Sequence, residues 1–153
     1  MPKHKILLPH NFSDYDHRAL EFVVRMFSHA DITLFNAYTP LPEVKDFVHE
    51  AAILDKLKTN LNQLSNRIQG METALNGVRQ NLLDSGFKED QVHCVFKERK
   101  TDTAGEIIDL ARKEHFDLIV INHKPGKFTR FFTGNVFEKI VQSLKNTAVC
   151  VVT

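Results

Sequence analysis

The chain has 153 residues, of which 42% are hydrophobic, 9% aromatic and 25% charged, as in an ordinary globular protein. This length predicts one domain spanning residues 1–153 that buries a core without disulfides or a structural metal. A formal charge of +1 excludes a nucleic-acid-binding protein that relies on a strongly basic surface. No apolar run approaches the roughly 18 residues of a membrane span, and no signal peptide pattern precedes Pro9, so we expect a cytoplasmic protein.

Short apolar runs alternate along the chain with longer amphipathic ones, which predicts strands alternating with helices. The first strand ends at Pro9, and Ser13 or Asp14 can cap the helix that follows. Thr103 and Glu106 have the spacing of a capping box and open a second helix, and another helix is expected over residues 133–144. The expected strands are residues 5–8, 32–37, 91–96, 117–121 and 148–152.

These strands are nearly continuous in apolar residues, which is typical of a parallel sheet covered by helices on both faces. The predicted fold is therefore α/β, with a five-stranded parallel doubly wound sheet in the order 3-2-1-4-5. Strand order reverses between the first and fourth strands, so a ligand crevice is expected at the carboxyl ends of residues 5–8 and 117–121. The last strand, residues 148–152, lies at an apolar edge, which predicts a homodimer that hides this edge.

A stripe of apolar residues with alternating spacings of four and three occupies the region between the second and third strands. We expect it to be the core-facing side of one long helix that ends near Gly86, because Gly70 and Gly77 disfavour a free-standing coiled coil. The alternative is a surface that pairs with a partner helix. This stripe comprises Leu57, Leu61, Leu64, Ile68, Met71, Leu75, Val78 and Leu82.

The turn after the first strand contains no glycine, so it is neither a dinucleotide-binding fingerprint nor a P-loop. Four polar residues cluster there, and a set of ligands or an acid–base pair is one reading of them. The reading we favour is that Asp14 and Asp16 complement the dipole of the following helix. The sequence has no zinc-binding or serine-hydrolase motif, and Cys94 and Cys150 read as small buried hydrophobic residues. We therefore assign no catalytic and no metal-binding residue. The four clustered residues are His10, Asp14, Asp16 and His17.

A basic segment, residues 122–136, follows the fourth strand and leads into a helix that Thr133 can cap. It contains Lys124, Lys127 and Arg130, and amide groups at a helix N-terminus with nearby cations favour an anion such as phosphate. The alternative is a solvated loop whose phenylalanines pack on the sheet. One short loop in a neutral protein does not indicate single-stranded nucleic acid.

Several segments resemble the universal stress protein family. Residues 5–14, followed by Arg18-Ala19-Leu20, resemble its opening I-L-V-P-x-D-x-S strand and turn and the R-A-L that follows them. Residues 117–121 resemble its fourth strand, residues 134–140 its G-S-V-x-E-x-V helix start, and residues 147–152 its closing strand. The resemblance covers nearly the whole chain except residues 41–90. It implies an adenine nucleotide alpha hydrolase-like fold and pairing through the last strand.

Family members with a nucleotide site carry the pattern G-x-x-G-x9-G-[ST], and here at least one glycine of the pattern is lost. Counting back from Gly134 without a gap places Lys124 and Ile121 at the first two glycine positions. A loop two residues shorter places Gly126 at the second position and His123 at the first. A side chain then stands where the backbone would approach phosphate.

Two further substitutions weaken the implied site: Asn135 replaces the hydroxyl residue of the pattern, and Asn11 replaces the acid that would meet the ribose. We predict a regulatory or adaptor domain with weak or no ATP binding and no other cofactor. The alternatives are a member that binds ATP or another adenine nucleotide, and an enzyme that uses His10 or His123 as acid or base. The residues expected to line the nucleotide pocket are Pro9, His10, Asn11, Ala37, Val120, Gly126, Lys127, Gly134, Asn135 and Val136.

Overall fold

A computed structural model describes residues 2–41, 51–123 and 136–153, with the backbone alone for residues 51–54. The expected strands are all present, and each bound lies within two residues of its predicted position. The elements in chain order are β1 (Lys5–Pro9), α1 (Asp14–Met26), β2 (Asp31–Tyr38), α2 (Ala51–Asp84), a short 3-10 helix (Glu89–Gln91), β3 (Val92–Glu98), α3 (Thr103–Glu114), β4 (Leu118–Asn122), α5 (Val136–Ser143) and β5 (Ala148–Val152).

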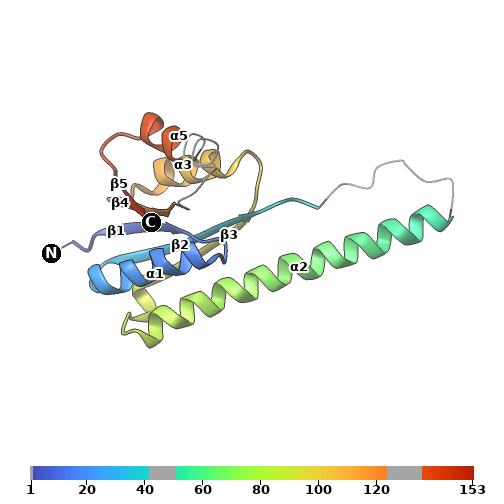
Figure 1. The fold of residues 1–153 in the computed structure, drawn as a ribbon, viewed down its shortest axis with the longest axis horizontal. Coiled ribbons are helices and arrows are strands. Elements are labelled where there is room, and N and C mark those ends of the chain that lie inside the picture. The colour runs from blue at the N-terminus through green and yellow to red at the C-terminus, as the bar shows by residue number, and fades with distance from the viewer. Residues whose placement is uncertain (1, 42–50, 124–135) are drawn as a thin grey trace.

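The five strands form one parallel sheet in the order β3-β2-β1-β4-β5, which confirms the predicted topology. Helices α1 and α2 cover one face of the sheet, and α3 and α5 cover the other (Figure 1). Successive residues of β1 serve opposite faces, because side chains alternate along a strand. Ile6 and Leu8 pack in the core on the α1–α2 side, whereas Leu7 packs in the core on the α3–α5 side.

Helix α2 is 34 residues long and extends well beyond the sheet (Figure 1). Its C-terminal part matches the expectation of a core-facing stripe, because Leu75, Val78 and Leu82 are 1%, 4% and 0% exposed. The expectation is wrong for the rest of the apolar stripe of residues 57–82, called the α2 stripe below. Residues Leu57 to Met71 of the stripe are half-buried and belong to neither hydrophobic core cluster of the described residues. The strands are much shorter than α2, so the sheet covers only the C-terminal part of this helix.

The C-terminal end of α2 is fixed by Gly86, as the sequence predicts. Gly86 has φ +106°, a left-handed conformation that an L-residue with a side chain rarely adopts. The reversal lets the Phe87 N–H donate to the Leu82 carbonyl at 3.2 Å and places Phe87 in the core at 5% exposed. The chain is then directed through the short 3-10 helix into β3.

The expected capping box at the start of α3 is wrong in its register. The N-cap is Asp102, one residue earlier than Thr103, and its carboxylate accepts from the Gly105 N–H at 2.7 Å. The Glu106 carboxylate accepts instead from the N–H groups of Lys100 and Thr101. An aspartate at the N-cap satisfies the free amide groups of the first turn as well as threonine does.

Strand β5 forms one edge of the sheet, as predicted, and its register partners are residues of β4. Its side chains are only partly covered, with Val151 36% exposed. Among the described residues, no helix is both long and apolar enough to span a membrane.

Candidate functional site

The expected crevice lies at the carboxyl ends of β1 and β4, and its first wall is the turn after β1. The His10 N–H donates to the Phe35 carbonyl at 2.9 Å, and the His10 carbonyl accepts from the Asn36 side-chain amide at 2.9 Å. These bonds continue the pairing of β1 with β2 past the end of β1. The backbone of His10 is therefore held by the sheet, although it lies in the turn.

The side chain of His10 points into the protein and is 2% exposed. Its ring meets the rings of Phe12 and His17 edge-on, each at a centroid distance of 5.2 Å. Neither ring nitrogen has a hydrogen-bond partner within the described part of the chain. Burial lowers the pKa of His10, an effect that the Asp16 carboxylate opposes and His17 reinforces. His10 is consequently a neutral ring at pH 7, with one donor and one acceptor that no described residue uses.

Asn36 on β2 is a second buried polar residue beside this turn, and it is 5% exposed. Its amide nitrogen is used by the His10 carbonyl, but its side-chain oxygen has no partner among the residues described. Unpaired buried polar atoms cost free energy and are uncommon, so they mark places where another group can bind. Sequence reasoning missed Asn36, because an asparagine inside an apolar strand carries no motif.

The turn takes an unusual backbone shape at Phe12, which has φ +62°. Glycine usually occupies this left-handed region, and an L-residue there costs about 1–2 kcal/mol. The ring of Phe12 packs against the core on the α1–α2 side, which offsets part of this cost. The tight turn is therefore built without the glycine that a dinucleotide fingerprint would supply.

Asp16 is 4% exposed, and both of its carboxylate oxygens are occupied. One oxygen accepts from the Ser13 N–H at 3.0 Å and from the Ser13 hydroxyl at 2.6 Å, and the Ser13 hydroxyl in turn accepts from the Asp16 N–H, which completes a capping box. The other oxygen accepts from the Asn122 side-chain amide at the end of β4. Ser13 is thus the helix cap, as predicted. Asp16 does more than complement the dipole, because it ties α1 to β4 across the crevice.

The residues expected to line the nucleotide pocket are only partly brought together by the described structure. Pro9, Ala37 and Val136 are half-buried at the ends of β1 and β2 and the start of α5, and Asn11 is exposed in the turn. Val120 is fully buried in the core on the α1–α2 side. The pocket assignment of these residues stays a prediction. Gly126, Lys127, Gly134 and Asn135 lie outside the described residues, as do Lys124, Arg130 and Thr133 of the expected anion site.

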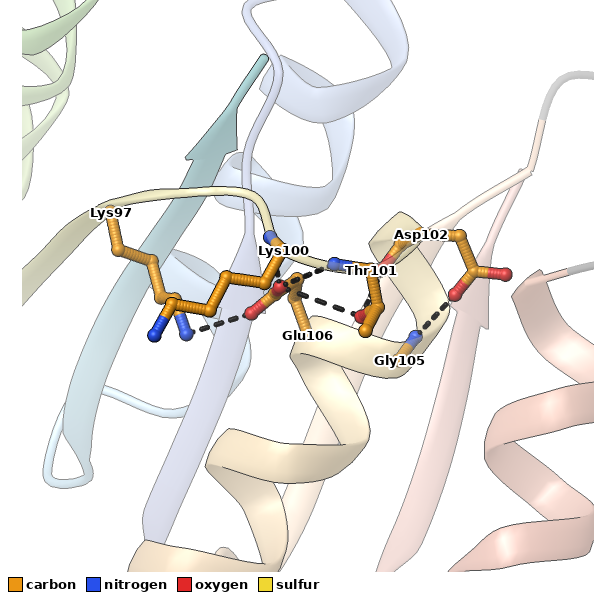
Figure 2. Close-up of polar contacts among 6 residues, drawn as sticks. All are labelled: Lys97, Lys100, Thr101, Asp102, Gly105 and Glu106. Atoms are coloured by element: carbon orange, nitrogen blue, oxygen red, sulfur yellow. Dashed lines mark hydrogen bonds and ion pairs between the residues drawn. The ribbon is translucent and has the colours of Figure 1, made fainter. Parts of the chain in front are cut away.

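A second polar cluster lies at the carboxyl end of β3, where Glu106 from α3 faces the β3–α3 loop (Figure 2). The Glu106 side chain is 1% exposed and forms an ion pair with Lys97 at 2.7 Å. It also accepts from the N–H groups of Lys100 at 2.6 Å and Thr101 at 3.0 Å. Burial opposes ionisation, but the bonds from Lys97, Thr101 and Lys100 outweigh it and lower the pKa of Glu106 to about 2. The carboxylate is charged at any physiological pH and holds the loop in place.

The same loop is joined to α5 by an ion pair between Asp102 and Lys139. The hydrogen bond from Lys139 and then that from the Gly105 N–H lower the pKa of Asp102. On the other side of the loop, the Arg99 N–H donates to the Tyr38 carbonyl at 2.8 Å. The end of β2, the loop after β3 and the first turn of α5 are thus connected at the carboxyl ends of the strands. In the described ranges, no group of three or more His, Cys, Asp or Glu residues is placed to hold a metal ion.

Comparisons with known proteins agree with this architecture. A model of the universal stress protein family matches residues 3–152. No curated protein sequence matches the chain at a significant level. Among solved structures, a hypothetical protein named MJ0577 shares 22% identity at a TM-score of 0.68, over 97% of this chain and 94% of that one.

Two further solved structures cover nearly all of both chains. The universal stress protein UspA from Lactobacillus plantarum has a TM-score of 0.67 at 17% identity, over 100% of this chain and 99% of that one. A universal stress protein solved in complex with cAMP has a TM-score of 0.64 at 15% identity, over 98% and 96%. At these identities the structures support the fold, whereas the family match extends over nearly the entire sequence. The chain belongs to the universal stress protein family.

Proposed function

We propose that this universal stress protein is a single-domain regulatory or adaptor protein of the cytoplasmic stress response, with weak or no binding of ATP. The observation that carries the proposal is the state of the acidic groups at the crevice. Asn11 stands where the family has an acid, and Asp16, the buried carboxylate of the turn, already accepts from Ser13 and Asn122. A ribose hydroxyl would find neither an acid at position 11 nor an oxygen of Asp16 that is not already accepting a hydrogen bond.

A role as an enzyme is less well supported. General acid–base chemistry needs a titratable group placed within hydrogen-bond reach of the reacting atom, and metal-assisted hydrolysis needs acidic ligands for the ion. Both oxygens of Asp16 already accept hydrogen bonds, and the His10 side chain is 2% exposed. We expect at most slow hydrolysis of ATP.

The alternative is that the crevice still binds an adenine nucleotide. One observation favours it: a relative of the same fold has been solved with cAMP. The unused polar atoms of His10 and Asn36 beside the turn could also accept or donate a hydrogen bond to a ligand. The two interpretations predict different effects on ATP binding when Asn11 is replaced by an acid.

Asn11→Asp is expected to strengthen ATP binding about tenfold, because one regained polar contact is worth about 0.5–1.5 kcal/mol and this one carries a charge. Asn11 is exposed, so the change does not disturb the core. The measurement is calorimetric titration of the wild type and the variant with ATP and magnesium. Asn76→Asp on the exposed side of α2 adds the same charge elsewhere and is the control. Tight binding by the wild type with no gain in Asn11→Asp would refute the proposal.

We further propose that the protein forms a homodimer through β5, whose edge exposes strand backbone and apolar side chains. Val151→Lys is expected to lower the molar mass in light scattering, because a lysine on an edge strand opposes pairing with another strand. Val141→Lys is the matched control, since Val141 on α5 is 49% exposed and Val151 is 36% exposed. An unchanged mass in Val151→Lys would rule out pairing through β5.

A further inference from the structure

The N-terminal two-thirds of α2 is a helix without a covering layer in the described chain. The helix begins at Ala51, and its first residue in a core cluster is Leu75. The segment of residues 51–74, called the α2 arm, is about 36 Å long at 1.5 Å per residue and projects away from the sheet (Figure 1). In proteins, most of the stability of a helix comes from the packing of its apolar face and not from helix propensity.

The α2 arm carries the five remaining residues of the α2 stripe, and these lie on one face. Leu57, Leu61, Leu64, Ile68 and Met71 are separated by four, three, four and three residues. Residues spaced alternately by four and three positions lie along one side of a helix. A helix needs such an apolar side to pair with another helix of the same repeat. The face is a continuation of the one with which Leu75, Val78 and Leu82 cover the sheet.

We propose that the α2 arm pairs antiparallel with the α2 arm of a second copy of this chain, about a two-fold axis. The direction follows from the sheet. In a parallel pair both sheets would lie at the same end and on the same helix face, between the two helices. An antiparallel pair places the two sheets at opposite ends of the paired segment.

The length of the α2 arm fixes the alignment. If residue 51 of one copy lies opposite residue 74 of the other, the whole uncovered segment is paired and neither helix runs into the sheet of its partner. In that alignment Leu57 lies opposite Ile68 of the second copy, and Leu61 lies opposite Leu64. Two-fold symmetry produces each of these layers twice, which is how an isologous contact forms from one patch.

The charges of the α2 arm fit the same alignment. Helix α2 has no acidic residue in its own first turn, and the alignment brings Glu72 of the second copy beside Ala51. A carboxylate near a helix N-terminus is favourable, because it faces the positive end of the dipole. On one flank of the paired helices, Lys58 lies nearest Ser65 of the second copy. On the other flank, Arg67 lies nearest Asn60 of the second copy. No like charges are therefore opposed along either flank of the paired helices.

The first test is the mass of the assembly in sedimentation equilibrium at tens of micromolar. Ile68→Glu places a charge in the paired face and is expected to halve the mass, whatever β5 contributes. Asn66→Glu adds the same charge on the exposed side of the helix and is expected to leave the mass unchanged. Ile68 lies outside both core clusters, and a cooperative unfolding transition at low micromolar concentration, with the same midpoint as the wild type, shows that the domain remains folded. Equal masses for the two variants would overturn the proposal.

The second test concerns direction and alignment. Lys58→Cys and Ser65→Cys proteins, both with Cys94 and Cys150 replaced by Ala, are oxidised separately and as a mixture. A covalent dimer is expected from the mixture and from neither protein alone. A covalent dimer from either protein alone, or none from the mixture, would refute the antiparallel alignment.

A third variant tests the charge argument. Glu72→Lys is expected to raise the dissociation constant of the helix pair about tenfold. An attraction between residue 72 and the partner helix N-terminus becomes a repulsion, and two-fold symmetry makes this happen twice. Thr73→Lys, on the exposed side, carries a new positive charge at the neighbouring position and is the control. Equal dissociation constants for these two variants would contradict the alignment.

Discussion

Glu106→Gln is expected to lower the free energy of unfolding by about 3 kcal/mol at pH 7. The carboxylate is 1% exposed and is bound by Lys97 and by two backbone N–H groups. Its pKa falls from 4.5 to about 2 on folding, and each pKa unit corresponds to about 1.4 kcal/mol. Glutamine fills the same space but presents an NH2 group to donors and leaves the Lys97 charge without its partner.

The pH dependence of this effect has a definite sign. A carboxyl group whose pKa is lowered on folding contributes its full stability above its unfolded pKa, and the contribution is lost as the pH falls through the folded pKa. The difference between wild type and Glu106→Gln is therefore expected to be full above about pH 5 and to shrink between pH 4.5 and pH 2. Urea unfolding across this range measures it. Asp109→Asn, exposed on the same helix, is the control. A loss of less than about 0.5 kcal/mol at pH 7 would contradict this account.

Leu82→Ala is expected to cost about 2–5 kcal/mol, the range for a large residue removed from a core. Leu64→Ala is expected to cost far less at concentrations where the protein is monomeric, although both leucines belong to the α2 stripe. Leu82 is 0% exposed between α2 and the sheet, whereas Leu64 is half-buried on the α2 arm. The contribution of a helix residue to the stability of the protein depends on what its side chain packs against. Only the C-terminal part of α2 reaches the sheet.

Denaturant unfolding of the two variants at low micromolar concentration measures this difference. At tens of micromolar, Leu64→Ala is expected to show an additional loss, because self-association adds an apparent stability that rises with the logarithm of the concentration. Equal losses for Leu64→Ala and Leu82→Ala at low concentration would mean that the whole α2 stripe packs within its own chain.

The sheet could be predicted from the sequence because buried parallel strands are nearly continuous in apolar residues. Their alternation with helical periods leaves few topologies. The α2 stripe shows where this reasoning stops. A repeat of four and three residues describes one face of a helix but does not say whether a sheet or another helix covers it. The extent of the sheet determines that, and it is a property of the folded chain.

The candidate site could be predicted in place but not in detail. Strand order located the crevice at the ends of β1 and β4, and Asp16 and Asn122 indeed meet there. These two residues are 106 positions apart in the sequence, so no local sequence pattern predicts the hydrogen bond between them. The spacing of Glu106 from Thr103 predicts a capping box, whereas in the structure Asp102 supplies the cap and Glu106 binds the loop. Local spacing suggests which backbone groups a side chain can reach, and tertiary packing decides among them.

The central claim is that this member of the universal stress protein family has lost most of its affinity for ATP. Calorimetric titration of the wild-type protein with ATP and magnesium tests it most directly. We predict no dissociation constant in the low micromolar range, because the loss of two or three polar contacts weakens binding by about tenfold to a thousandfold. Low micromolar binding that Gly134→Trp abolishes would contradict the claim and establish an adenine nucleotide site in the crevice.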